Sequence, residues 1–185
     1  MEPTQHSVVT SSLGLASGTV RVVPYDPEWP GLFAAEARRL TLALSPWPIA
    51  LEHTGSTSVP GLDAKPILDI LAGVAEGQSF DPYITGLVGA GYIHRGEQGI
   101  PGREFFRRGD PRAYHIHLTH IDGPFWRGHL AFRDYLRAHA DARDEYARLK
   151  HALAAQFPHD REAYTDHKAP FVGRVVELAS RAGSP

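Results

Sequence analysis

One segment of this sequence carries residues whose types and spacing could bind a phosphate group. Residues 53–62 read HTGSTSVPGL, and a predicted strand at residues 66–74 follows, with Asp69 inside an apolar run. Gly55 lets the backbone approach an anion closely, and the hydroxyls and amides after it can bind that anion. A carboxylate buried in such a strand is costly unless it is paired or ligates a metal. The segment therefore predicts an anion site beside a carboxylate.

Structural interpretations of the same residues stay open. Asp69 is also compatible with capping a loop or pairing with an arginine, because ion-pair networks place acids in the same way. Gly55 and Ser56 on their own fit a plain turn.

Histidine is the second source of chemistry, with 11 in the chain. His115 and His117 are two residues apart on a predicted strand, so their side chains share a face and can present two imidazoles to one metal. His53 ends a neighbouring predicted strand. We expect these three to converge on Asp69. The alternative for the pair is a solvated face or hydrogen bonds to backbone carbonyls.

Basic side chains could neutralise a bound anion. Arg103 and Arg107 share one face of a predicted strand, and guanidinium groups recognise phosphate in a bidentate manner. A solvated edge strand with paired charges is the alternative. Helical spacing also aligns His129 with Arg133, and Tyr164 with Lys168, although such pairs are often surface pairs.

The elements that must position these residues follow from the hydrophobic pattern. Asp26 and Pro27 predict the start of a helix that runs to about Leu44, and Pro170 should kink or split the last helix. The near-continuous apolar run around Asp69 predicts a strand buried on both faces. Strands are expected at residues 20–24, 49–53, 66–74, 92–94, 104–108 and 114–119, and further helices at 80–90, 126–139, 142–157 and 160–181.

Composition narrows the class of protein. With 185 residues, 42% hydrophobic and 22% charged, the chain can bury an ordinary core. We expect a flexible arm at residues 1–18 and a single domain at 19–185. The net charge of −2 argues against a duplex nucleic acid partner. The absence of cysteine removes thiolate chemistry and fits a cytoplasmic location, and no apolar run is long enough for a membrane span.

Several motifs together resemble the GrpB family, also called UPF0157. The most specific is the string at residues 53–62, followed by KPILDI at 65–70. The others are PYDPEWP at 24–30, GIPGR at 99–103, FFR at 105–107, HIH at 115–117, FRDYL at 132–136 and REAY at 161–164. The resemblance extends over nearly everything from Val20 to Arg181.

The resemblance implies a divergent nucleotidyltransferase fold: an α+β domain with a mixed sheet flanked by helices and a helical C-terminal part. Some family members are fused to dephospho-coenzyme A kinase. The superfamily pattern places Gly-Ser after one strand and two acids, one residue apart, on the next. Gly55-Ser56 and Asp69 fit, with 12 residues between Ser56 and Asp69, but the second acid is replaced by Leu71. Two-metal phosphoryl transfer needs more carboxylate than Asp69 supplies.

Two functions follow as expectations. The first is a nucleotidyltransferase-like enzyme acting on a nucleotide or another phosphate-bearing small molecule with a divalent ion (Mn, Zn or Mg). The second is a non-catalytic phosphate-binding module that kept the fold and lost the paired acids. For the first, the expected catalytic residues are Asp69, Ser56 and Lys168, the expected metal ligands are Asp69, His53, His115 and His117, and the expected ligand-binding residues are Gly55, Ser56, Thr57, Ser58, Lys65, Arg103, Arg107, Arg133 and Tyr164.

Overall fold

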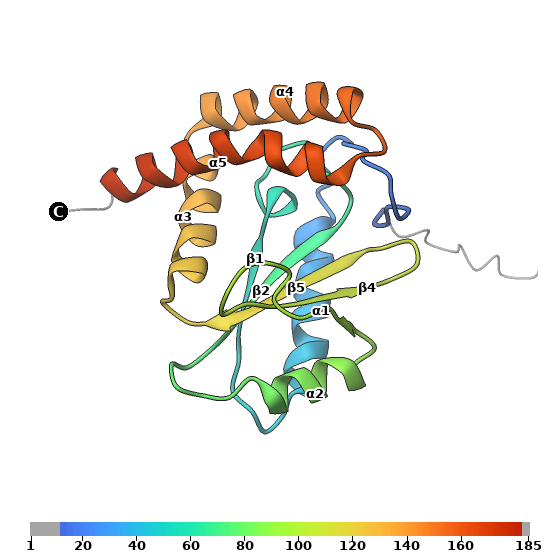
Figure 1. The fold of residues 1–185 in the computed structure, drawn as a ribbon, viewed down its shortest axis with the longest axis vertical. Coiled ribbons are helices and arrows are strands. Elements are labelled where there is room, and N and C mark those ends of the chain that lie inside the picture. The colour runs from blue at the N-terminus through green and yellow to red at the C-terminus, as the bar shows by residue number, and fades with distance from the viewer. Residues whose placement is uncertain (1–11, 183–185) are drawn as a thin grey trace, which may run out of the picture.

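The computed structural model describes residues 12–182, which form a five-stranded mixed sheet with helices on both faces (Figure 1). The strand order is β1-β2-β5-β4-β3. The central pair, β2 and β5, is parallel, and every other pair is antiparallel. The strands are β1 (Ala50–Thr54), β2 (Leu68–Val74), β3 (Ile93–His94), β4 (Glu104–Arg108) and β5 (Tyr114–His120). The predicted α+β class is confirmed.

Helices α1 (Trp29–Ala43) and α2 (Asp81–Gly89) cover one face of the sheet. Their apolar side chains, among them Leu40 and Leu87, pack against Ile70 and Ile116 of the two central strands in the main core. This burial helps to explain why β2 is almost wholly apolar. The other face lies below α3 (Pro124–Ala138), α4 (Ala140–Gln156) and α5 (Arg161–Ala182), which are grouped together in Figure 1.

The register of the sheet sorts side chains between these two faces. Asp69 pairs with Thr54 of β1 on one side and with His115 of β5 on the other. Directly paired residues point to the same face, and neighbours along a strand point to opposite faces. The C-terminal helices therefore cover the face that carries Asp69 and His115, whereas Ile70 faces α1 and α2.

The first described residues, which belong to the expected flexible arm, contact the rest of the chain. Leu13 and Leu15 are buried, and the backbone of Leu15 forms an antiparallel bridge with Arg112. Gly14 N donates a further hydrogen bond to Pro66 O. Two leucines spaced two residues apart give this short segment an apolar side to bury, which a Ser/Gly-rich composition conceals. Residues 1–11 of the expected arm lie outside the described residues.

One local prediction is wrong: the strand expected at residues 20–24 is reduced to one isolated bridge, between Val23 and Ala64. Pro170 lies inside the last helix, which continues past it as one element to Ala182, so of the two expected effects the split is absent. The remaining expected strands and helices are present, with ends that agree to within three residues. None of the helices within residues 12–182 has the length and apolar character needed to cross a bilayer.

Candidate functional site

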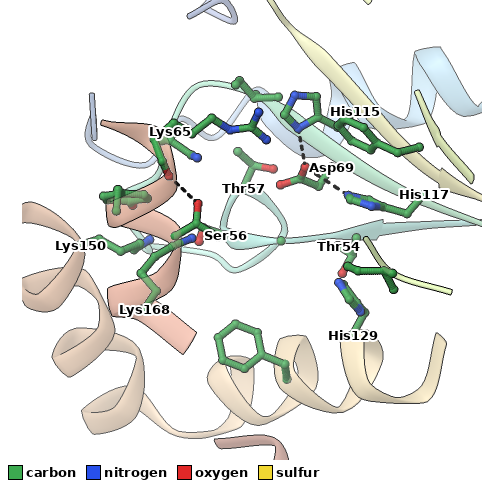
Figure 2. Close-up of a pocket in the computed structure, with 18 of the residues that line it drawn as sticks. Thr54, Ser56, Thr57, Lys65, Asp69, His115, His117, His129, Lys150 and Lys168 are labelled. Atoms are coloured by element: carbon green, nitrogen blue, oxygen red, sulfur yellow. Dashed lines mark hydrogen bonds and ion pairs between the residues drawn. The ribbon is translucent and has the colours of Figure 1, made fainter. Parts of the chain in front are cut away.

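A cavity of about 460 Å³ lies between the Asp69 face of the sheet and the C-terminal helices. It is shown in Figure 2, where side chains from the loop after β1, from β2 and β5, and from the helices surround one space. Asp69 is the only carboxylate that lines it among the described residues. The lysine and arginine side chains that line it outnumber this carboxylate, so the cavity is suited to an anion.

The loop after β1 forms one wall of the cavity and depends on a glycine. Gly55 has a φ of 69°, in the left-handed region that side chains rarely adopt. A Cβ at this position would lie 2.5 Å from Oδ2 of Asp69. The absence of a side chain thus allows the loop to pass directly over the carboxylate. A short 3-10 turn, Ser56–Ser58, follows and ends with the buried Ser58.

Side chains outside the cavity hold this loop in place. Nε2 of His53 lies 3.0 Å from the Thr57 hydroxyl, and burial lowers the pKa of His53 to about 4. Arg133 donates a hydrogen bond from Nη1 to the His53 carbonyl. Arg137 donates two more, from Nε and Nη2, to the Ser58 carbonyl. The loop is therefore fixed in its conformation without a ligand.

Asp69 contacts both histidines of β5. Nδ1 of His115 donates to Oδ1 of Asp69 at 3.1 Å, and Nε2 of His117 lies 3.7 Å from the same oxygen. Burial opposes ionisation of Asp69, but its hydrogen bonds with both histidines hold its pKa well below the usual value. Burial lowers the pKa of His115, against the opposing effect of Asp69. The carboxylate is thus anionic at neutral pH.

The residues that surround Asp69 do not fit a self-contained metal site. Leu71, at the position of the expected second acid, is fully buried and pairs with His117 in the sheet. Within residues 12–182, no group of three or more His, Cys, Asp or Glu side chains is arranged to hold a metal ion. Nε2 of His115 and Nδ1 of His117 are buried without a hydrogen-bond partner. The anionic group of this site is therefore Asp69 alone.

Five basic side chains line the same cavity: Lys65, Arg103, Lys150, Arg161 and Lys168. They come from the loop before β2, from the segment before β4 and from helices α4 and α5. Burial is the first cause that lowers the pKa of Lys65, to about 7, and the nearby Lys168 adds to the effect. Burial also lowers the pKa of Lys168 and holds that of Lys150 well below its usual value.

Ten of the residues expected from the sequence line this cavity: Gly55, Ser56, Thr57, Lys65, Asp69, Arg103, His115, His117, Tyr164 and Lys168. Four do not. His53 is stacked on Phe33 of α1, with ring centroids 4.8 Å apart, so it lies on the opposite face from Asp69. Arg133 is paired with Glu52 and Asp134. Ser58 donates its hydroxyl proton to Gly55 O, and Arg107 lies outside the lining.

Sequence reasoning missed the contributions of the helices, above all Lys150, Arg161 and Tyr146. Lys150 is 2% exposed despite its charge. One signal was present in the sequence: the chain has 19 lysines and arginines, and only three of them are lysine, at positions 65, 150 and 168. Their rarity sets them apart from the ordinary basic surface residues, which are all arginine.

An apolar cavity of about 370 Å³ adjoins the basic one. The two share Thr54, Gly55, His129, Phe132 and Tyr146 as lining residues. The remaining walls of the apolar cavity are Pro124, Phe125, Gly128, Val172 and Val176. The combined space can take a ligand with an anionic end and an apolar or aromatic end.

A family model described as "GrpB protein" matches residues 19–178, in agreement with the resemblance drawn from the motifs. A UPF0157 protein of Pseudomonas aeruginosa is 42% identical over 168 residues, which cover 88% of this chain and 69% of the relative. A UPF0157 protein of Bacillus subtilis is 39% identical over 163 residues, 88% of this chain and 48% of the relative. The chain thus spans about half the length of the Bacillus protein.

Solved structures agree with this placement. The crystal structure of the conserved protein GrpB from Enterococcus faecalis matches with a TM-score of 0.81 at 35% identity, over 88% of this chain and 98% of that one. A structure of the Cid1 poly(U) polymerase with MgGTP bound matches with a TM-score of 0.52 at 16% identity, over 72% of this chain and 44% of that one. The second likeness concerns the fold alone, and it supports the nucleotidyltransferase-like architecture.

Proposed function

We propose that this chain, which belongs to the GrpB protein family, binds the phosphate groups of a nucleotide or of another phosphorylated small molecule. The observation that carries the proposal is the charge of the cavity: five lysine and arginine side chains and a single carboxylate line it. Cationic side chains and free loop amides are the groups that recognise phosphate in proteins.

The loop after β1 supplies the expected phosphate cradle. Gly55 keeps the backbone free of a side chain, and Ser56 and Thr57 line the cavity beside it. Lys168 and Lys65 lie on the same side of the cavity as Ser56, where they can neutralise phosphate oxygens (Figure 2). The adjoining apolar cavity offers room for the part of the ligand that carries no charge.

The cheapest test is thermal unfolding in the presence of phosphate, pyrophosphate, triphosphate, ATP and adenosine. A ligand that binds only the native state raises the melting temperature, by an amount that grows with its concentration over its dissociation constant. We expect the shift to increase with the number of phosphates and to vanish for adenosine. Equal shifts from sulfate at matched ionic strength, or none from any phosphate, would reject the proposal.

Group transfer is a second candidate function, favoured by the ionised Asp69 directly below the Gly55 loop. In this proposal the oxygen of an acceptor hydroxyl, or of water, attacks the α-phosphate of a nucleoside triphosphate, and the bond to the leaving pyrophosphate breaks. Asp69 accepts the proton of the attacking hydroxyl, and Lys168 and Arg103 stabilise the negative charge on the phosphate and the pyrophosphate. Pyrophosphate release from a nucleoside triphosphate tests it. Asp69→Asn should abolish release while the triphosphate still binds, and release that survives the substitution would exclude Asp69.

A further inference from the structure

All three lysines of this chain line one cavity, although they are far apart in sequence. Lys65 lies in the loop before β2, Lys150 in α4 and Lys168 in α5. The chain's other basic side chains, 16 in number, are arginines. Arginine stays protonated in proteins, whereas a lysine can lose its proton when it is buried. We call these three residues the lysine cluster. They are the basic side chains of the cavity that can gain and lose protons.

The lysine cluster contacts aromatic rings and a backbone carbonyl rather than carboxylates. Nζ of Lys65 and Nζ of Lys168 lie 5.0 and 4.8 Å from the ring centroid of the same residue, Tyr164. Nζ of Lys150 lies 4.7 Å from the ring centroid of Tyr146 and donates a hydrogen bond to Asp63 O. Among the ion pairs of residues 12–182, none involves a lysine.

Charge balance in the empty cavity disfavours full protonation of the cluster. The negative charge of Asp69 favours the protonated form of Lys65 and Lys168, and that of Asp63 favours the protonated form of Lys150. The positive charges of Arg161 and of the neighbouring lysines disfavour the protonated form. Desolvation also disfavours it, and is the largest effect on every member of the cluster. The remaining charged group near Lys65 is Arg112, which also repels. One carboxylate inside the cavity cannot offset several cations.

We propose that the lysine cluster binds its anion by taking up protons, so that it is incompletely protonated when the cavity is empty and becomes fully protonated when a polyanion enters. The inference rests on the proposed phosphate ligand. Phosphate oxygens among the amines favour the ammonium form and offset the repulsion between neighbours. Because protons and ligand bind together, the affinity falls as the pH rises, by about tenfold per pH unit for each proton taken up.

The composition of the chain makes a direct test feasible. Lysine labelled with ¹³C at Cε gives only three side-chain signals, each of which reports its own protonation as the pH changes. Arg148→Lys adds a fourth lysine at an exposed position of α4, outside the cavity, and serves as an internal reference. ATP in the presence of EDTA is the probe, because its phosphates are already largely ionised above about pH 7.

We expect at least one signal of the cluster to titrate near pH 7 in the free protein and to shift upward by more than one unit with saturating ATP. Calorimetry of ATP binding in two buffers of different ionisation enthalpy should show proton uptake at pH 8. Lys65→Arg should reduce this uptake, because arginine keeps the positive charge but is already protonated before ATP binds. ATP binding without a change in lysine protonation would overturn this inference alone. Failure of ATP and of inorganic triphosphate to bind at any pH would overturn the proposed function as well.

Discussion

Gly55 and Asp69 approach so closely that a methyl group on the glycine would lie 2.5 Å from the carboxylate oxygen Oδ2. The position of the loop that forms one wall of the cavity therefore depends both on the absence of a side chain at Gly55 and on the hydrogen bonds that hold the loop. Since the same carboxylate contacts His115, a change at the glycine is transmitted to both sides of the cavity.

Gly55→Ala should lower the free energy of unfolding by about 2 kcal/mol, for two reasons. The new Cβ would clash with Asp69, and alanine would have to adopt the left-handed φ of the glycine. Gly173→Ala is a matched control in α5, where a Cβ meets nothing within 4 Å and should stabilise slightly. Urea denaturation measures both. Part of the cost should disappear when Gly55→Ala is combined with Asp69→Ala, which removes the carboxylate but keeps the Cβ of residue 69, 3.0 Å from the added methyl group. Full additivity of the two substitutions would show that the contact is not the cause.

The buried His53 predicts a loss of stability in mild acid. Burial lowers its pKa to about 4 in the native state, whereas an unfolded histidine titrates near 6.5. Between these values the unfolded state binds more protons, so stability falls as the pH drops. From pH 6.5 to pH 5 this residue alone should cost about 1 to 2 kcal/mol.

The check is a series of urea unfolding curves at pH 5 to 7 for the wild type and for His53→Gln. The substitution should make the pH dependence shallower, although His129, with a pKa of about 4, adds a similar effect that remains. The exposed His159→Gln is the control. A slope unaltered by His53→Gln would mean that this histidine is not buried in its neutral form.

Arg133 is predicted to stabilise the loop without binding the ligand itself. It donates hydrogen bonds to the His53 carbonyl and to Glu52, and its side chain is only 10% exposed. Arg133→Met should therefore lower the free energy of unfolding by about 1 to 3 kcal/mol. Its effect on triphosphate affinity should be smaller than that of Lys168→Ala, measured by calorimetry. A stable variant that no longer binds triphosphate would instead assign Arg133 to the ligand.

A divalent ion held by Asp69, His115 and His117 together with ligand phosphates remains a prediction. A mixed imidazole and carboxylate set accepts manganese or zinc better than magnesium, which prefers oxygen ligands. We expect manganese or zinc to increase the affinity for triphosphate and His117→Ala to remove the increase. His120→Ala, on the same strand but outside the cavity, should leave it unchanged. Equal enhancement by magnesium and manganese in both variants would argue against histidine ligands.

The parts of the site that lie on adjacent strands could be predicted from the sequence. Alternation along a strand places His115 and His117 on one face, and the parallel pairing of β2 with β5 brings that face to Asp69. The same reasoning failed for His53 because the pairing of β1 with β2 sets Thr54, rather than His53, opposite Asp69. A difference of one residue in register places every side chain on the opposite face of the sheet. The register cannot be inferred from the residue at which a strand ends in the sequence.

The helical side of the site could not be predicted in the same way. Lys150 and Arg161 reach the cavity only because α4 and α5, which pack against α3 and against each other, lie over the sheet. Neither residue stands in a sequence pattern that differs from an ordinary polar helix surface. Local periodicity predicts that a helix exists but not where its polar residues meet those of another element. Leu13 and Leu15 illustrate the same limit, since their burial depends on Pro66 and Arg112, far away in sequence.

The most direct measurement of the central claim is calorimetric titration of inorganic triphosphate into the wild type, Lys168→Ala and Arg148→Ala at pH 7. Both substitutions remove one basic residue, but only Lys168 lines the cavity. Loss of a charged contact to phosphate should weaken binding about 10- to 100-fold in Lys168→Ala, with little change in Arg148→Ala. Equal weakening in the two variants, or no binding to the wild type, would contradict a phosphate site in this cavity.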